Sequence, residues 1–357
     1  MHPIIFIMLF TNKLIAWYIQ NKRNLPWRET SDPYIIWLSE IILQQTRVAQ
    51  GLPYFEKFTH DYPTVFQLAN ASEDHVMRNW QGLGYYNRAR NLHETAKKVA
   101  FELGGEFPSN YKDLQKLKGV GTYTAAAIAS IAFGENIPVV DGNVYRVLSR
   151  VFGITTDISS GKAFKIFQEK AQSLIDPTQP DLFNQAIMDF GAIHCTPKKP
   201  LCNECIFSKE CIAFQTNEVL SLPIKLTKTK VKKRFLDFII FQDKNNNTYI
   251  EQRNEQDIWQ KLYQFPLFES FDNPIENIHL KVAEVYKETP YTTITLLNSE
   301  PIIHLLSHQK LHINFWQVDL KIALEKATPW KDLNKFAFPI VIHNFIQQIL
   351  EKNERHT

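Results

Sequence analysis

Apolar residues along this chain follow two different spacings, one before and one after Val219. Before it they recur every three to four residues, the period of an amphipathic helix, and glycine or proline separates the runs. This pattern predicts an all-α first part. The helices expected there span 33–48, 74–80, 88–103, 123–133 and 182–190.

Beyond Val219 the pattern favours strands instead. Segments rich in β-branched and aromatic residues lie at 235–241 and 292–297, and the asparagine tract 245–247 predicts a hairpin turn. The change indicates a second domain of the α+β class. We expect a helical domain over 8–215, a linker over 216–234 and the α+β domain over 235–352.

Composition and charge narrow the class of protein only in part. Of the 357 residues, 44% are hydrophobic and 22% are charged, which disfavours disordered, collagen-like and coiled-coil chains. The formal net charge of +3 permits a polyanionic partner without requiring one. The basic run from Lys225 to Arg234, which includes Lys228, is as typical of a solvated linker as of a phosphate-binding strap.

An apolar stretch near the start, Ile4–Phe10, is too short to cross a bilayer. It has no basic region before it and no small-residue cleavage site after it, unlike a secretory signal. Because the sequence has no longer apolar run, we expect a cytoplasmic protein without a membrane partner, with Met8 as an alternative start to Met1.

All four cysteines lie close together, with the spacing Cys195-x6-Cys202-x2-Cys205-x5-Cys211. In a reducing compartment, clustered thiols are more typical of a metal centre than of disulfides. Zinc is one alternative, although four-cysteine zinc sites commonly use two tight pairs and only one exists here. A four-iron cubane accepts irregular spacing more readily.

Glu40 lies in an otherwise apolar helical pattern. Its neighbours at helical spacing include Ile36, Trp37 and Leu43. Such surroundings predict a partly desolvated carboxyl with a raised pKa, which suits a general acid at neutral pH. A buried glutamate with a structural hydrogen bond is the alternative.

A glycine turn and an aspartate form a second candidate site. Gly119 and Gly121 permit a tight turn whose N–H groups, with the dipole of the next helix, can hold a phosphate. Most such turns only connect helices. Asp141 stands where an apolar extended stretch meets a helical pattern, and taken singly it is most typical of an N-cap.

The order of these features resembles the helix-hairpin-helix glycosylases of the endonuclease III superfamily. The glycine turn comes first, then the segment PVVDGNVYRV around Asp141, then the four cysteines. The segment WLSEIILQQT closely resembles the one that holds the catalytic glutamate in the MutY family of adenine DNA glycosylases. The resemblance implies that Glu40 and Asp141 are catalytic. It also implies that the cysteines bind a [4Fe–4S] cluster in a basic loop that faces DNA.

Tyr123 distinguishes two branches of this superfamily. Bifunctional glycosylase-lyases resemble this chain but carry a lysine at the matching position, and its amine forms a Schiff base with the sugar. A tyrosine cannot do this chemistry, so the resemblance implies a monofunctional glycosylase. Tyr123 and Asn143 are then expected to orient the two carboxyls.

Further residues match positions that contact DNA in the MutY family. Gln45 and Tyr85 match the side chains that the family inserts into the DNA stack. Lys118 replaces the usual proline of the hairpin and adds a charge that can reach a phosphate. The other expected DNA contacts, for which core or helix-surface roles are the alternative, are Arg28, Leu43, Thr46, Gly119 and Gly121.

The second domain resembles the Nudix-like C-terminal domain of the same family. The segment DIWQKLYQFP, 257–266, carries this likeness, with Lys261 in place of a glycine. The acidic helix with which Nudix hydrolases bind Mg²⁺ is absent from the sequence, so we expect recognition without hydrolysis. Ser307 and His308 match the loop that reads 8-oxoguanine, where Leu306 replaces a phenylalanine.

The resemblance implies hydrolysis of the N-glycosidic bond of adenine mispaired with 8-oxoguanine or guanine, after base flipping. The expected partner of this monomer is double-stranded DNA that contains the mispair, on the nucleoid of a bacterial cytoplasm. A bifunctional lyase of the endonuclease III type and a non-enzymatic iron–sulfur DNA-binding module are the alternatives.

Overall fold

The computed structural model describes residues 3–227, 230–271, 274–286 and 290–354, and Lys228 of the basic run lies outside them. Contacts within the chain define two compact units. The first contains Met1–Asn70 and Asn91–Lys228, and the second contains Ala71–Arg90 and Thr229–Thr357. The segment Ala71–Arg90 therefore belongs to the second unit although helices of the first unit flank it in sequence.

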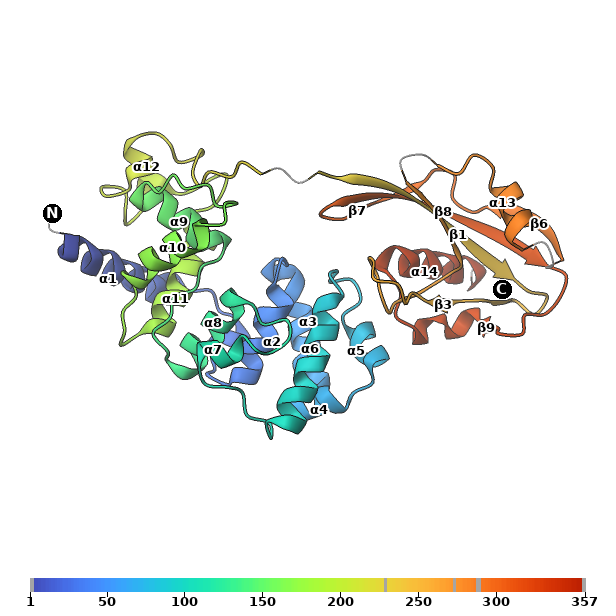
Figure 1. Ribbon diagram of the computed structural model, residues 1–357, viewed down its shortest axis with the longest axis horizontal. Helices are drawn as coiled ribbons and strands as arrows, with labels where there is room; N and C mark the ends of the chain where they lie inside the picture. The colour runs from blue at the N-terminus through green and yellow to red at the C-terminus, as the bar shows by residue number, and fades with distance from the viewer. Residues whose placement is uncertain (1–2, 228–229, 272–273, 287–289, 355–357) are drawn as a thin grey trace. The chain divides into compact units, whose positions relative to one another are not determined.

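Helices make up the chain before the sheet, as the apolar spacing predicts (Figure 1). The α-helices are α1 (Pro3–Asn21), α2 (Pro33–Leu43), α3 (Val48–Asp61), α4 (Val65–Asn70), α5 (Glu73–Asn79), α6 (Asn87–Lys97), α7 (Tyr111–Leu114), α8 (Thr122–Phe133), α9 (Gly142–Phe152), α10 (Ala163–Gln172), α11 (Pro180–Asp189) and α12 (Ile212–Gln215). Short 3₁₀ or π segments are η1 (Pro26–Arg28), η2 (Lys98–Glu102), η3 (Phe190–His194) and η4 (Cys202–Glu204).

One expected helix is wrong in extent. The pattern over 33–48 predicts a single helix, but α2 ends at Leu43 and α3 begins at Val48. Between them Gln45 has a positive φ of 56°, a backbone conformation that no α-helix contains. Among the helices that the structure describes, none combines the length and apolar character needed to cross a membrane.

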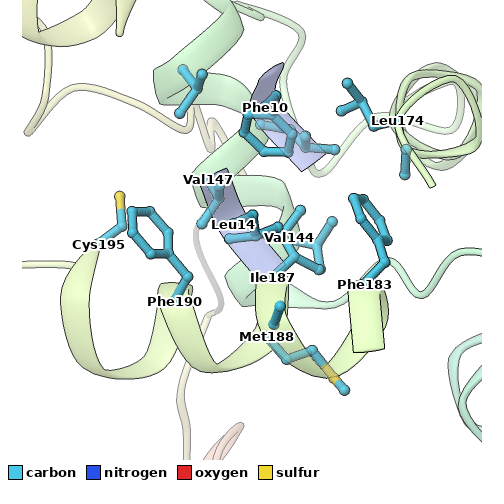
Figure 2. Close-up of a cluster of buried hydrophobic side chains, with 14 of the residues drawn as sticks. Phe10, Leu14, Val144, Val147, Leu174, Phe183, Ile187, Met188, Phe190 and Cys195 are labelled. Carbon is cyan, nitrogen blue, oxygen red and sulfur yellow. The ribbon is translucent and has the colours of Figure 1, made fainter. Parts of the chain in front are cut away.

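The core of the first unit forms where α1, α9 and α11 pack together. Figure 2 shows Phe10 and Leu14 of α1 beside Val147 of α9 and Ile187 of α11. All four side chains are at most 1% exposed. The same cluster includes Cys195 and Cys211, so the core supports both ends of the cysteine segment.

The second unit is built on a five-stranded sheet with two long parallel strands at its centre. The order is β5-β1-β8-β6, and β7 also pairs with β8. Its strands are β1 (Lys232–Gln242), β5 (Leu267–Phe271), β6 (Tyr291–Leu296), β7 (Ile302–Leu305) and β8 (Gln309–Leu320). Shorter pairs involve β2 (Asn247–Thr248) with β9 (Thr328–Pro329), and β3 (Glu251–Gln252) with β4 (Tyr263–Gln264).

Two helices cover parts of this sheet. Residues Ile278 and Val282 of α13 (Ile278–Val285) join Ile239 and Val318 in one buried cluster. Side chains alternate between the two faces of a sheet, so Phe315 of β8 lies on the face opposite to Val318. On that face Phe345 of α14 (Ile340–Glu354) stacks on Phe315, with ring centroids 3.7 Å apart. The η5 segment (Trp330–Lys335) precedes α14. The expectation of a helical part followed by an α+β part is thus confirmed.

The expected hairpin at 245–247 is only partly correct. The chain does turn there, with Asn246 at a φ of 59° and the Asp243 carboxylate accepting from the Asn247 N–H at 2.9 Å. However, the strand that follows pairs with β9 rather than with β1, whose neighbours are β5 and β8. Local turn chemistry fixes a turn but not the partner of the next strand.

Candidate active site

Glu40 lies near the end of α2, and its side chain is almost fully buried. Asp32 starts this helix by accepting the backbone N–H of Tyr34 at 2.8 Å, the usual N-cap bond. The Glu40 residue is 9% exposed. Burial raises the pKa of its carboxyl, while a hydrogen bond with Tyr123 and the positive charge of Arg28 act in the opposite direction. The carboxyl is therefore desolvated and touches only a few polar groups.

Asp141 caps the N-terminus of α9. Its carboxylate accepts the Val144 N–H at 2.8 Å and the side-chain amide of Asn143 at 2.7 Å. Burial raises the pKa of Asp141, and these hydrogen bonds, with the charge of Arg146, partly oppose that shift. The Oδ1 atom of Asp141 accepts the capping bond and Oδ2 accepts the bond from Asn143. Each carboxylate oxygen has two lone pairs, so Asp141 can still accept further hydrogen bonds.

Tyr123 joins these two carboxyls. It lies in the first turn of α8, where its hydroxyl hydrogen-bonds with Glu40 and lies 3.1 Å from the sulfur of Met188. Burial and then the charges of Glu40 and Asp141 raise the pKa of Tyr123 well above 10, so the hydroxyl stays protonated. Because both carboxyls act on one phenol, the structure brings Glu40, Tyr123 and Asp141 into a single site.

Asn143 is fixed in turn by Arg146, a residue that the sequence pattern did not single out. The guanidinium donates to the Asn143 side-chain oxygen at 2.7 Å and to the Gly191 carbonyl at 2.6 Å. It also donates to the Cys195 carbonyl at 2.8 Å. Since Arg146 takes the amide oxygen of Asn143, only the NH₂ group can face Asp141.

Arg28 is held beside the site by a buried aspartate that sequence reasoning also missed. Asp189, at 0% exposed, accepts from Arg28 at 2.9 Å and from Arg23 at 2.6 Å. The charge of Arg28 reaches the Glu40 carboxyl and lowers its pKa. An acidic residue at a buried position of α11 was the available signal, because a buried carboxylate requires partners.

The glycine turn takes the conformation that its sequence predicts. Gly119 has a φ of 77°, and a Cβ there would lie 2.8 Å from the Cβ of Asn91. Gly121 is the N-cap of α8, and a Cβ there would meet nothing within 4 Å, which leaves open space at the helix N-terminus. Lys118, which is expected to reach a phosphate, is exposed and forms an ion pair with Glu94.

The two residues expected to insert into DNA share an unusual backbone. Gln45 and Tyr85 have φ values of 56° and 48°, in the left-handed region that costs a non-glycine residue energy. Both are exposed, Tyr85 by 46%. Leu43 and Thr46, which are also expected to contact DNA, are half-buried and lie within two residues of Gln45 in sequence.

The four cysteines line one pocket, together with Arg150 and His194. Arg150 lies 3.4 Å from the Cys195 sulfur, and burial raises the pKa of Cys205 to about 12. In the described residues no three His, Cys, Asp or Glu side chains are placed to hold a single metal ion. Four thiols around one apolar pocket, with a cation beside them, nonetheless have the donor set that a cluster with one cysteine per iron requires.

In the second unit, Ser307 and His308 form the turn between β7 and β8. The Leu306 N–H donates to the Gln309 carbonyl at 2.8 Å, which closes the turn. Ser307 and His308 are exposed, and Leu306 is half-buried. Lys261, where the family likeness has glycine, has a φ of 69°, so the chain retains the backbone of a glycine at that position.

Comparison with known proteins gives the class first. Residues 38–173 match the model of the HhH-GPD superfamily base excision DNA repair proteins, and residues 238–348 match a NUDIX domain. A thermostable thymine-DNA glycosylase shares 33% identity, with a TM-score of 0.55 over 59% of this chain and 97% of that one. An endonuclease III–DNA complex, at 21% identity and a TM-score of 0.53, shares the fold.

Full-length relatives then give the family. The adenine DNA glycosylase of Buchnera aphidicola subsp. Schizaphis graminum is 34% identical over 97% of this chain and 99% of its own length. The human adenine DNA glycosylase is 47% identical over 59% of this chain and 40% of its own length. The chain belongs to the adenine DNA glycosylase family, which are hydrolases of N-glycosyl bonds.

Proposed function

We propose that this protein removes adenine paired with 8-oxoguanine or guanine by hydrolysis, and leaves an abasic site in double-stranded DNA. The observation that carries this proposal is that Tyr123 hydrogen-bonds with the buried Glu40 and lies close enough to the capping Asp141 for the charge of that carboxylate to raise the Tyr123 pKa. Hydrolysis of an N-glycosidic bond needs an acid for the leaving base and an anion near the oxocarbenium-like sugar. Two carboxyls in one site can supply both.

The surroundings of the two carboxyls divide these roles. Asp141 receives hydrogen bonds from Val144 and Asn143 and the charge of Arg146, all of which favour its ionised form. At Glu40, a hydrogen bond with Tyr123 and the charge of Arg28 favour the ionised form, whereas burial and the charge of Asp141 favour the protonated form. Glu40 is therefore the carboxyl that holds the proton and delivers it to N7 of adenine, and Asp141 is the anion that faces the sugar.

The chemistry at Tyr123 favours a monofunctional enzyme. The phenol of Tyr123 has no amine nitrogen, so it cannot form a Schiff base with the sugar. Borohydride reduction should accordingly trap little covalent protein–DNA complex, whereas a glycosylase-lyase would be trapped efficiently. Efficient trapping through another amine would refute the monofunctional part of the proposal and leave the adenine specificity standing.

Base flipping assigns a purpose to the left-handed residues. Because adenine must leave the stack before its sugar is reached, the gap must be filled from the protein side. Gln45 and Tyr85 stand exposed on backbone that strains a non-glycine residue. Such strain is typical of residues presented to a ligand. We propose that the same DNA contacts the half-buried Leu43 and Thr46 and occupies the open space beside Gly121.

The pocket of the four cysteines is proposed to hold the [4Fe–4S] cluster. Cys195, Cys202, Cys205 and Cys211 would each bind one iron, and Arg150 would offset the negative charge of the thiolates. The cluster would hold the loop 195–211 in a fixed conformation. It would take no part in the bond cleavage proposed above.

We assign lesion reading to the turn at Ser307 and His308. Ser307 lies at an exposed turn, where its hydroxyl hydrogen-bonds with that of Tyr85, and Leu306 replaces the aromatic ring of the family with a smaller aliphatic group. Adenine removal belongs to 8–215 and recognition to 235–352, in a monomer that works on the nucleoid of a bacterial cytoplasm. Restoring the ring with Leu306→Phe should increase the preference for 8-oxoguanine over guanine.

The proposal is tested by adenine release under single-turnover conditions. Duplexes with adenine opposite 8-oxoguanine, guanine or thymine differ only in the opposing base. We expect release from the first two and none from the third. Binding to the 8-oxoguanine duplex without release, by protein whose iron content matches one cluster per chain, would instead support a DNA-binding module.

A further inference from the structure

One face of the central sheet in the second unit is covered at one end and open at the other. In β1 and β8, which are parallel and in register, Ile239 and Val318 lie under α13 and are 0% exposed. Toward the start of both strands, the same side chain alternation presents Phe235 and His312, which are only half-buried. Their rings stack with centroids 4.9 Å apart.

Two lysines stand next on this open end. Lys233 and Lys310 are cross-strand neighbours, one step of the alternation before Phe235 and His312. Burial and the charges of Lys310 and Lys233 lower the pKa of His312, so the imidazole is a neutral ring beside two cations. Like charges on directly neighbouring strands destabilise a sheet, which makes this pairing costly unless an anion binds there.

In the part of the second unit that the structure describes, no carboxylate forms an ion pair with either lysine, and the carboxylate on the same face of β1, Asp237, accepts hydrogen bonds from Asn314 and Trp316 instead. The ion pairs seen there include neither Lys233 nor Lys310. The nearby carboxylate Glu269 pairs in register with Leu236, so it points to the opposite face, where it binds Arg234 at 2.6 Å.

The open end also adjoins the turn at 306–308. Leu305, which is 70% exposed, is the cross-strand neighbour of Lys310, and the turn begins at the next residue. Ile303, 47% exposed, is the neighbour of His312. The surface therefore combines two cations, two stacked rings and two exposed aliphatic side chains next to the proposed lesion-reading turn.

We propose that this basic half-face, formed by Lys233, Lys310, Phe235 and His312, binds the phosphate backbone of the DNA strand that carries the oxidised guanine. The proposal rests on the function proposed above. Each lysine neutralises one phosphate, and the rings with the aliphatic groups pack against the adjoining sugars. Contacts of this kind position the strand for the turn and carry no sequence information.

Salt dependence of DNA binding tests the proposal, because each phosphate contact adds about 0.9 to the slope of log Kd against log salt concentration. The probe is a duplex with 8-oxoguanine opposite 2′-fluoroadenosine, whose fluorine destabilises the oxocarbenium-like cation and keeps the DNA intact. Full-length Lys233→Gln/Lys310→Gln protein should lose about 1.8 of that slope. Lys233→Arg/Lys310→Arg should retain it.

The chain provides a matched control in Lys244 and Lys321. Both are exposed and follow the far ends of β1 and β8, on the order of 30 Å from the basic half-face along the strands. Lys244→Gln/Lys321→Gln changes the net charge equally and should leave the slope unchanged. An unchanged slope in the Lys233/Lys310 variant, or an equal loss in the control, overturns the proposal.

Failure of the basic half-face and failure of the glycosylase function give different results. If the wild-type protein releases adenine from the cleavable duplex and the slope is unchanged in the Lys233→Gln/Lys310→Gln variant, only the role of the basic half-face is refuted. If the wild-type protein neither releases adenine nor binds the duplex, the proposed function is refuted, and this inference is refuted with it.

Discussion

Replacing Glu40 by glutamine should make the protein more stable and much less active. The substitution keeps the size of the side chain and an oxygen that can accept the Tyr123 hydrogen bond, but removes the acidic proton. General acid catalysis typically contributes about 10²–10⁴-fold to a rate, so single-turnover adenine release should fall by about that factor.

The gain in stability follows from the direction of the Glu40 pKa shift. Burial raises this pKa above its value in the unfolded chain, so the folded state keeps the proton longer as the pH rises. Wild-type stability then falls with rising pH through that interval, by up to about 1.4 kcal/mol per pH unit. Below the unfolded pKa both states are protonated and this penalty is absent. Glutamine has no proton to lose, and its stability does not follow this slope.

Urea denaturation at about pH 5 and about pH 8 measures the effect. The difference in unfolding free energy between Glu40→Gln and wild type should grow in favour of the variant at the higher pH. Glu56→Gln, the same change at an exposed position of α3, is the matched control and should show no such growth. A variant that becomes relatively less stable as the pH rises would refute the reasoning, as would undiminished adenine release.

Three further substitutions test the support of the site. Asp189→Asn leaves Arg28 beside an uncharged partner, and loss of one member of a buried ion pair should cost about 3 kcal/mol in urea denaturation; a loss below about 1 kcal/mol would contradict this. Arg146→Met frees the Asn143 amide to rotate, so single-turnover release should slow about tenfold or more with little change in DNA affinity, whereas a loss of affinity alone would argue for a binding role. Gly119→Ala places a side chain on left-handed backbone, and thermal unfolding should show destabilisation by about 1 kcal/mol or more.

The sequence predicted the setting of the two carboxyls of the candidate site better than the side chains that hold them in place. The apolar neighbours of Glu40 indicated a buried carboxyl, and the step from extended to helical pattern indicated the cap at Asp141, because both signals are local. Asp189 and Arg146 act on Arg28 and Cys195, which lie far away in sequence. No periodic pattern encodes such a partner.

The same limit applies to the fold. Helix spacing predicted the elements of the first part, yet the break at Gln45 follows from a single backbone conformation that an apolar run conceals. In the second unit, the asparagine tract predicted a turn, but the partner of the next strand depends on β9, which is formed by residues much later in the chain. The ion pair of Lys118 with Glu94 likewise depends on a side chain of α6 that lies 24 residues away in sequence.

The parallel pairing of β1 with β8 also sets the order in which the two parts of the chain can fold during synthesis. During synthesis β1 and its antiparallel neighbour β5 leave the ribosome before β8, which is formed only by Gln309–Leu320. Pairing between distant segments is slow to form because a long loop must close first. The helical part can therefore complete its core while the edge of β1 that pairs with β8 is still unpaired. An unpaired strand edge favours aggregation, so the nascent chain is vulnerable during that interval.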